Sequence, residues 1–379
     1  MKKTNQNKEF VDGITRDLER HRREIDQIDE KLLDLISSRF SIVKEIGKIK
    51  DHANAAVIDT ARESHVIQRL FSLNRDGLLP QKALFQIFTA IISASRSIQQ
   101  AGLQQASEMK PPSIFTVIGN PISHSLSPTM HNSAFSAVGY HGLYLPLELD
   151  DIGLAVSGLK ALRFSGASIT IPHKVAVMEF LDEIDEMALE IKAVNTIANL
   201  NGRLKGYNTD FTGAIRALST KTDIKDRDVT VIGAGGAARA IGFGVKSEGG
   251  RLTIVNRSKE KGEKLAGALD AAFIPLSDLT QLDCDILINT TAVGMAPHID
   301  SMPVPKEVLD KHMVVMDIVY NPLKTRLLKE AEHIGCSTID GVCMFIYQGA
   351  GQFELWTKLK APVDIMKLAV LAALDEYDA

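Results

Sequence analysis

The chain has 379 residues, of which 45% are hydrophobic, and its formal net charge is -4 at pH 7. This length predicts two or three domains with ample apolar cores, and the mildly acidic balance argues against a nucleic-acid partner. The sequence has no stretch of about 18 apolar residues and no apolar segment behind its charged start, so we expect neither membrane insertion nor export.

The first expected element is one long amphipathic helix from about residue 14 to residue 51. Its apolar residues recur at intervals of three and four without a proline: Leu18, Ile25, Ile28, Leu32, Leu35, Ile36, Val43 and Ile46. A helix of this length indicates a partner helix along much of it. Two more helices are expected over about 59–74 and 80–100. We therefore predict a three-helix, all-α domain over residues 1–100, followed by a Gly- and Pro-containing linker over 101–113.

The spacing of three cations on the long helix decides whether they can bind one ligand. At about 100° and 1.5 Å per residue, Arg39 and Lys50 lie on one face, roughly 16 Å apart. Arg22 lies about 25 Å from Arg39 and about 100° around the helix, so only a second chain can bring it to the same ligand. Other polar residues of this region, each also typical of an exposed helix face, are Asp59, Arg62, Glu63, Ser95 and Gln99.

Taken together, these residues resemble the all-helical chorismate mutases over residues 14–100. The matching pattern is R-x-x-I-x-x-I-D-x-x-L-L-x-L-I-x-x-R, then I-G-x-x-K, D-x-x-R-E and I-I-x-x-S-R-x-x-Q. The resemblance implies an interlocked homodimer with two active sites, each completed by the partner's helix. The rearrangement of chorismate passes no proton and needs no nucleophile, so the protein has only to fold the dianion and stabilise charge on its ether oxygen.

The same resemblance implies a role for each polar residue. Arg22 of the partner, Arg39 and Arg62 would hold the substrate carboxylates. Lys50 and Gln99 would face the ether oxygen. Glu63 and the neighbourhood of Asp59 would receive the hydroxyl group, and Ser95 would add a polar contact.

After Ser113 the pattern changes to short apolar strands that alternate with helices, which is typical of an α/β fold. The expected strands cover residues 114–119, 144–149, 166–171, 230–235, 252–255, 286–290 and 314–319. We predict a first α/β lobe over 114–212, closed by residues 340–379, and a Rossmann nucleotide lobe over 213–339.

The segment from Val229 to Ser258 has the order of a dinucleotide-binding unit: strand, glycine turn, helix, strand. The turn, Gly233-Ala234-Gly235-Gly236-Ala237-Ala238, lets the backbone approach a pyrophosphate at the start of a helix. The second strand ends in Asn256-Arg257-Ser258, with Lys261 one turn later and no carboxylate for the ribose hydroxyls. These cations favour the 2′-phosphate of NADP over NAD. The alternative is an ordinary cationic helix start, which the helix dipole disfavours.

The first lobe contains several polar residues in short motifs. Ser125 and Ser127 stand in a turn closed by Pro128, Lys174 follows the strand end Thr170, and Asn195 and Asp210 lie further along the chain. Taken singly, the serines also fit turn or cap chemistry, and Asp210 fits a helix N-cap.

Jointly, these motifs resemble shikimate dehydrogenase from Ile114 nearly to the C-terminus. They are VIGNPISHSLSPTMHNSAF, GASITIPHK, KAVNTI, GYNTDFTGA, DIVYNP and D-G-x-x-M-F-I-Y-Q-G. The resemblance implies that Lys174 and Asp210 form the acid/base pair, because hydride delivery to a ketone creates an alkoxide that must gain a proton. The remaining implied contacts are those of Ser125 and Ser127 with the carboxylate, of Thr170, Asn195 and Gln348 with the hydroxyls, and of Tyr320 with the carboxylate or nicotinamide edge.

One position departs from the family pattern, since Ser168 stands where asparagine is common, and this puts one substrate contact in doubt.

The prediction is a bifunctional enzyme of aromatic amino-acid biosynthesis with NADP as cofactor and no metal. Three cysteines without paired spacing, Cys284, Cys336 and Cys343, favour the cytoplasm. Two alternatives stay open: a helical domain that senses prephenate or an aromatic amino acid and dimerises, and an NAD-linked quinate dehydrogenase.

Overall fold

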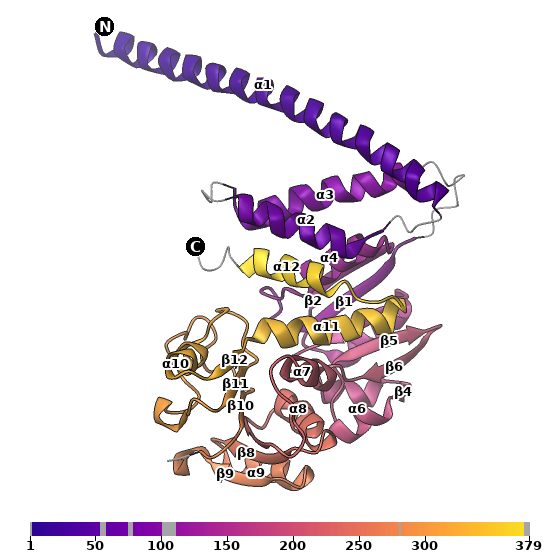
Figure 1. Ribbon diagram of the computed structural model, residues 1–379, viewed down its shortest axis with the longest axis vertical. Helices are drawn as coiled ribbons and strands as arrows, with labels where there is room; N and C mark the ends of the chain where they lie inside the picture. Colours follow the sequence, from indigo (N-terminus) through magenta and orange to yellow (C-terminus); the bar gives the residue numbers. More distant parts are fainter. Residues whose placement is uncertain (1, 54–57, 75–78, 101–110, 280–281, 375–379) are drawn as a thin grey trace. The chain divides into compact units, whose positions relative to one another are not determined.

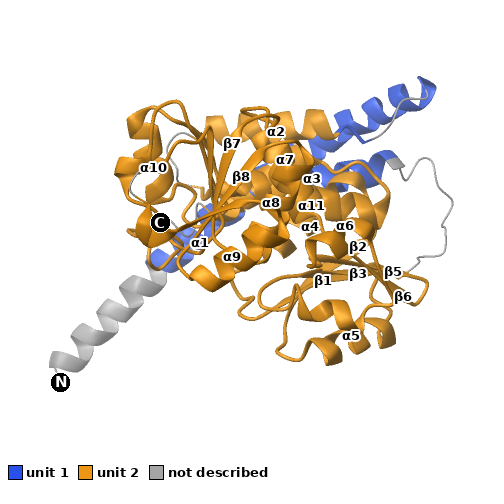
Figure 2. Ribbon diagram, turned by 90° about the horizontal axis from the view of Figure 1, so that it is seen from below, with its two compact units in different colours: residues 1–59, 89–109 blue, residues 60–88, 110–379 orange. Residues whose placement is uncertain are grey.

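The computed structural model describes residues 2–53, 58–74, 79–100, 111–279 and 282–374. The chain forms two compact units (Figure 2): residues 1–59 with 89–109, and residues 60–88 with 110–379. In this division residues 60–88 group with the α/β part, and the helical domain over 1–100 stays a prediction. Most of the predicted linker lies outside the described residues.

The first unit consists of helix α1 (Lys2–His52) and the C-terminal part of helix α3 (Gln81–Gln100). Helix α1 begins well before the predicted residue 14, because a proline-free polar segment can extend a helix that already exists. The two helices approach closely at Gly47, where an ideal Cβ would lie 3.3 Å from Gln99 Cγ. The side-chain amide of Gln99 donates to the carbonyl of Val43 at 3.3 Å.

Large apolar side chains along one face of helix α1, here called the apolar seam, are exposed. These residues follow a heptad repeat and are 41–68% exposed: Leu18, Ile25, Ile28, Leu32, Leu35, Ile42, Ile46 and Ile49. Such a repeat is the pattern that packs against another helix.

The second unit contains two six-stranded sheets (Figure 1). The first sheet has the order β2-β1-β3-β5-β6-β4 and mixes parallel and antiparallel pairs. Its strands are β1 (Ser113–Gly119), β2 (Gly142–Glu148), β3 (Gly166–Ile169), β4 (Glu183–Ile184), β5 (Thr196–Leu200) and β6 (Arg203–Tyr207).

The second sheet has the order β9-β8-β7-β10-β11-β12 and is parallel throughout. Its strands are β7 (Asp228–Ile232), β8 (Arg251–Asn256), β9 (Ala272–Pro275), β10 (Ile286–Asn289), β11 (Val314–Asp317) and β12 (Ser337–Ile339). This is the doubly wound order of dinucleotide-binding folds, in which a ligand binds where the strand order reverses, between β7 and β10. The predicted Rossmann fold is confirmed.

The helices of this unit cover the sheets and close the first lobe. They are α2 (Thr60–Leu73), α4 (Ser127–Val138), α5 (Ile152–Ala161), α6 (Glu186–Ile191), α7 (Asp210–Leu218), α8 (Gly236–Ser247), α9 (Lys259–Ala268), α10 (Arg326–Ile334), α11 (Gly341–Thr357) and α12 (Val363–Leu374). Helix α11 packs on α7, and α12 packs on α4 and α2 (Figure 1). The C-terminal helices therefore return to the first lobe.

Sequence analysis missed the antiparallel hairpin formed by β5 and β6. Its two-residue turn, Asn201-Gly202, has positive φ at both positions, 56° and 94°. Asparagine followed by glycine is a preferred sequence for such a turn, so the Asn-Gly pair between the two strand segments could have revealed the hairpin. The hairpin matters because it connects Asn195 to Asp210.

No helix in the described ranges is long and apolar enough to cross a membrane. The same residues contain no group of three or more His, Cys, Asp or Glu side chains placed to hold a metal ion.

Candidate active sites

The structure brings Lys174 and Asp210 together as an ion pair. Lys174 Nζ lies 2.5 Å from Asp210 Oδ2, and the side chains are 19% and 8% exposed. Lys174 follows β3, and Asp210 is the first residue of α7. A largely desolvated pair of this kind can hold and move a proton at a reacting oxygen.

A hydrogen-bond network orients the Asp210 carboxylate. Asn195 Nδ2 donates to Asp210 Oδ1 at 2.8 Å, and its Oδ1 accepts from the Thr209 amide, also at 2.8 Å. Asn208 Oδ1 accepts from the Asp210 amide at 3.0 Å, and Asn208 Nδ2 donates to the Ala193 carbonyl at 2.9 Å. Asn195, predicted as a substrate contact, is thus also committed to the acid/base pair.

The paired serines lie at the start of α4. Ser125 Oγ accepts from the amide of Ser127 at 3.3 Å, and Ser127 is buried. The turn contact expected of these serines is therefore present, while α4 has no side-chain cap, and the contact leaves the Ser125 proton available to a ligand.

Helix α11 carries Gln348 against α7. An ideal Cβ on Gly213 of α7 would lie 2.7 Å from the backbone nitrogen of Gln348, so only glycine permits this crossing. Gln348 Nε2 donates to the Phe345 carbonyl at 2.9 Å, and the Tyr320 ring stacks on the Phe345 ring with centroids 4.8 Å apart.

Thr170 follows β3, where its backbone amide donates to the Ile118 carbonyl at 2.9 Å. Ser168, the departure noted above, is buried. It accepts from the Tyr144 hydroxyl at 2.6 Å and donates to Gln352 Oε1 at 2.8 Å. Its hydroxyl is thus committed inside the protein.

The glycine turn lies at the switch point of the second sheet. Gly233 has a φ of 120°, and an ideal Cβ there would lie 2.5 Å from Thr290 Oγ1, so the turn requires glycine. A Cβ on Gly235 would meet no described atom within 4 Å, so the space that a pyrophosphate needs is open in front of Gly235. An ideal Cβ on Gly236 would lie 3.8 Å from Lys174 Cδ, which places the acid/base pair beside the start of α8.

The predicted phosphate contacts lie at the end of β8 and just after it. Asn256 Nδ2 donates to the Ser258 carbonyl at 2.8 Å, and Ser258 Oγ caps α9 by accepting from the Lys261 amide at 3.5 Å. Arg257 and Lys261 are exposed, and neither side chain has a hydrogen bond or ion pair within the described ranges. Two uncommitted cations beside a helix start suit the 2′-phosphate.

In the first unit, α1 and α3 bring three of the predicted chorismate residues together. The Arg39 guanidinium donates to Ser95 Oγ, and Gln99 lies one turn further along α3 beside Val43. Burial lowers the pKa of Arg39, whose guanidinium stays charged at neutral pH. Lys50 lies near the end of α1, and Arg22 is exposed on the same helix. The remaining predicted residues, Asp59, Arg62 and Glu63, lie just before and in the first turn of α2.

A buried polar cluster at the ends of β10 and β11 was not predicted. Asp317 accepts from Asn289 Nδ2 at 2.9 Å, from Thr325 Oγ1 at 2.7 Å and from the Val319 amide at 3.0 Å. An asparagine and an aspartate at the carboxyl ends of buried strands are a signal that could have revealed it. The cluster fixes the loops at the carboxyl edge of the nucleotide sheet.

Burial raises the pKa of Asp317 to about 6, above the 3.8 of an unperturbed aspartate. A raised pKa in the folded state means that this group favours folding below about pH 4 and loses that contribution as pH rises through about 6. We expect Asp317→Asn to become more stable relative to the wild type between pH 4 and pH 7, by up to about 3 kcal/mol. Urea unfolding of both proteins at a series of pH values checks this. Parallel pH profiles would contradict it.

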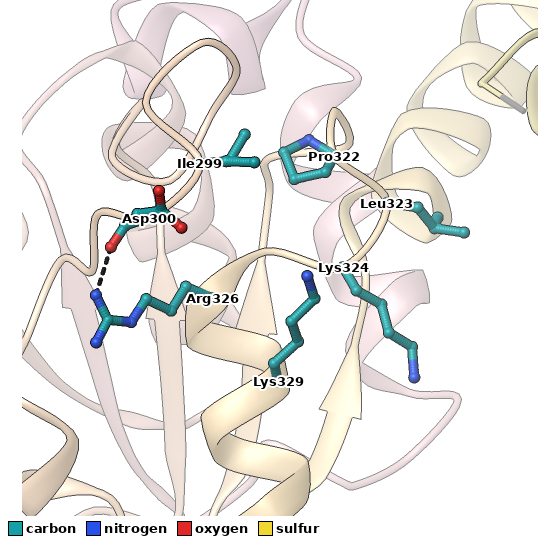
Figure 3. A pocket seen from close by; sticks show the side chains of 7 residues that line it. All are labelled: Ile299, Asp300, Pro322, Leu323, Lys324, Arg326 and Lys329. Atoms are coloured by element: carbon teal, nitrogen blue, oxygen red, sulfur yellow. Dashed lines mark hydrogen bonds between the residues drawn. The ribbon is translucent and has the colours of Figure 1, made fainter. Parts of the chain in front are cut away.

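A pocket lies beside the start of α10 (Figure 3). It is lined by Ile299, Asp300, Pro322, Leu323, Lys324, Arg326 and Lys329. Arg326 Nη1 donates to the Asp300 carbonyl at 2.6 Å, and Lys324 pairs with Glu332 at 2.7 Å. None of the predicted site residues lines this pocket.

Comparison with known proteins decides the family of the larger unit. A shikimate dehydrogenase (NADP(+)) of Pyrococcus abyssi is 44% identical over 263 residues, which are 69% of this chain and 98% of that protein. The chain belongs to the shikimate dehydrogenase family. Its residues match the shikimate dehydrogenase substrate binding domain (117–197), shikimate / quinate 5-dehydrogenase (216–341) and the shikimate 5'-dehydrogenase C-terminal domain (341–371).

Solved shikimate dehydrogenase structures agree. One in complex with NADP+ has a TM-score of 0.66 and 39% identity, and the match covers 72% of this chain and 99% of that one. A second, from Thermus thermophilus with NADP(H) and shikimate, has a TM-score of 0.64 and 33% identity, covering 68% and 99%.

The N-terminal helices match a different family. Residues 21–100 match chorismate mutase type II. The chain is therefore a fusion of a chorismate mutase domain with a shikimate dehydrogenase, as the two resemblances predict.

Proposed function

We propose that the α/β part catalyses the NADPH-dependent, reversible reduction of 3-dehydroshikimate to shikimate, and that the helical domain converts chorismate to prephenate. The observation that carries the first activity is the Lys174–Asp210 pair, at 2.5 Å, beside the start of α8. The family membership of both parts supports the pairing of activities.

In this proposal each residue has a defined task in the dehydrogenase. Ser125 and Ser127 bind the carboxylate of shikimate, and Thr170, Asn195 and Gln348 orient its hydroxyl groups. Tyr320 lies toward the carboxylate or the nicotinamide edge. Lys174 and Asp210 supply the proton that the new alkoxide needs and accept it in the reverse direction.

NADP is the cofactor of this proposal. When bound it supplies or accepts the hydride. Gly233, Ala234, Gly235, Gly236 and Ala237 would hold its pyrophosphate, since the backbone there is close to open space and to the N-terminus of α8. Asn256, Arg257, Ser258 and Lys261 would hold its adenosine ribose and 2′-phosphate.

The cofactor preference gives a direct prediction. Arg257→Ala should raise KM for NADP about 10- to 100-fold, the effect of one charge-assisted hydrogen bond, and change KM for NAD little. Shikimate oxidation followed with each cofactor measures this. Lys259→Ala is the matched control, because Lys259 is a cation two residues after Arg257, at the start of α9, but pairs with Glu263 at 3.8 Å. Equal changes with both cofactors would exclude a phosphate role for Arg257.

For the mutase, we infer a homodimer formed through α1. The exposed apolar seam of this helix supports it, because a second α1 would bury the seam and bring Arg22 of the partner to the other chain's site. Arg39, Arg62, Lys50 and Gln99 would bind the dianion and the ether oxygen, with Asp59, Glu63 and Ser95 as further polar contacts. A cytoplasmic location completes the proposal, and the free thiols of Cys284, Cys336 and Cys343 support it.

One preparation of the full chain tests both activities. We expect chorismate consumption and shikimate-dependent reduction of NADP in the same sample. If chorismate is unchanged while prephenate alters the dehydrogenase kinetics, the helical domain is a sensor instead. Faster turnover of quinate with NAD would favour the quinate alternative.

A further inference from the structure

The buried side chain of Gln352, on helix α11, bridges two strands of the first sheet. Its amide oxygen accepts from the Ser168 hydroxyl of β3 at 2.8 Å. Its amide nitrogen donates to Thr196 Oγ1 of β5 at 3.1 Å and to the Asn195 carbonyl at 3.3 Å. Ser168 and Thr196 are paired residues of these antiparallel strands. Gln352 therefore crosslinks β3 near its end with β5 at its start.

The hydrogen-bonding capacity of Gln352 is used inside the protein. A carbonyl can only accept, so the Gln352 nitrogen must face the Asn195 carbonyl and its oxygen must face Ser168. The His131 ring donates to the same oxygen from Nε2 at 3.2 Å, and this ring is neutral because burial lowers the His131 pKa to about 3. A side chain that is 2% exposed and already has two donors and two acceptors engaged has no capacity left for a ligand.

Two hydrogen bonds carry the constraint from Gln352 to Asp210. Thr196 Oγ1 accepts from Gln352, so it can donate its own proton, and it donates to Asn195 Oδ1 at 2.7 Å. The Thr209 amide donates to the same oxygen at 2.8 Å. With its oxygen held on that side, Asn195 turns Nδ2 toward Asp210 and donates to Oδ1 at 2.8 Å.

Strand β3 leads to the other member of the acid/base pair. Ile169 of β3 donates its amide to the Asn195 carbonyl at 2.8 Å, so this carbonyl binds both β3 and Gln352. Further along, the Lys174 carbonyl accepts from the Val194 amide, also at 2.8 Å. The crosslink therefore ties the segment that carries Lys174 to the segment that carries Asn195.

We propose that Gln352 is a positioning residue for the acid/base pair. It acts on Asp210 through the side chains of Thr196 and Asn195. This inference rests on the proposed function, in which Lys174 and Asp210 move the proton of the reacting hydroxyl. The two carboxylate oxygens of Asp210 are divided between Asn195, at Oδ1, and Lys174, at Oδ2, so a shift of the Asn195 amide also turns the oxygen that faces the lysine. A displacement of about 1 Å in such a group can lower the rate about 10²-fold.

A double-mutant cycle on the full chain tests whether Gln352 acts through Asn195. Gln352→Met keeps the length of the side chain and removes its hydrogen bonds. We expect it to lower kcat for shikimate oxidation about five- to thirtyfold in the wild-type background, the effect of one to two hydrogen bonds. In the Asn195→Ala background it should change kcat less than about twofold, because the connection to Asp210 is already broken. Initial rates at saturating shikimate and NADP measure all four proteins.

Trp356→Phe is the matched control. Trp356 lies one turn after Gln352 on α11, and its Nε1 also donates to β5, at the Ile197 carbonyl, at 2.9 Å. A general loosening between α11 and β5 would act on both variants alike. We expect Trp356→Phe to change kcat by the same factor with and without Asn195→Ala.

The inference is overturned if Gln352→Met lowers kcat by the same factor in both backgrounds, or leaves kcat unchanged in a protein that unfolds at the wild-type Tm. Coupling of Trp356→Phe with Asn195→Ala as strong as that of Gln352→Met would also overturn it. If Gln352→Met does not fold, Thr196→Val decides by the same cycle, because it removes the connecting hydroxyl. A wild type that does not oxidise shikimate would be a separate result, since it would overturn the proposed function and the inference with it.

Discussion

Lys174→Met is expected to lower kcat for shikimate oxidation by about 10²- to 10⁴-fold and to change KM much less. The reason is that Lys174 would act on the proton of the reacting oxygen, a contribution of general acid/base catalysis that appears mainly in the transition state. The initial rate of NADP reduction at saturating shikimate measures the effect.

Lys205→Met provides the matched control for this prediction. Lys205 also forms a lysine–carboxylate pair in the first lobe, 2.6 Å from Glu183, but at an exposed edge away from the predicted site residues. A loss in Lys174→Met no larger than in Lys205→Met would mean that the pair with Asp210 is only structural.

Mixing two inactive mutase variants should restore chorismate mutase activity. Arg22→Ala and Arg39→Ala are each expected to lose about 10²- to 10³-fold in kcat, since each removes a charged group that holds the reacting dianion. Each proposed site uses Arg39 of one chain and Arg22 of its partner. In a dimer of one variant with the other, both substitutions therefore fall in the same site, and the second site keeps both arginines. Random exchange of equal amounts should therefore recover about a quarter of the wild-type activity.

The dehydrogenase activity of the same samples is the internal control, because neither arginine belongs to the α/β lobes. Activity that stays at the level of the single variants, after exchange has been verified by mass, would show that Arg22 and Arg39 do not serve a shared site. Recovery without any dimer in the sample would exclude the role of the partner chain.

The fold and the motif residues could be predicted from the sequence because their signals lie in short, continuous segments. Strand periodicity and a glycine turn are local, and Lys174 and Asp210 each lie in a recognisable short segment. The Tyr144–Ser168–Gln352 contacts could not be found in this way, because the partners are 24 and 184 residues apart and only the folded sheet brings them together. Gln352 did carry a weak signal, since it follows Gln348 by one helical turn.

The neighbours of helix α2 show a second limit of sequence reasoning. Helix α2 packs on α12, at the other end of the chain, and the three consecutive helical segments of the sequence do not predict this contact. Periodicity reports which face of a helix is apolar and not which neighbour covers it. Ile67 of α2 is buried, and the local pattern does not say which neighbour covers it.

The exposed seam of α1 has a consequence for how the two activities respond to dilution. A site completed by a second chain exists only while two chains are associated, whereas the residues proposed for shikimate oxidation all come from one chain. Specific mutase activity should therefore fall as the enzyme is diluted below the dissociation constant of the dimer, while specific dehydrogenase activity stays constant. The ratio of the two turnover rates would then measure, without any label, how much of the protein is paired.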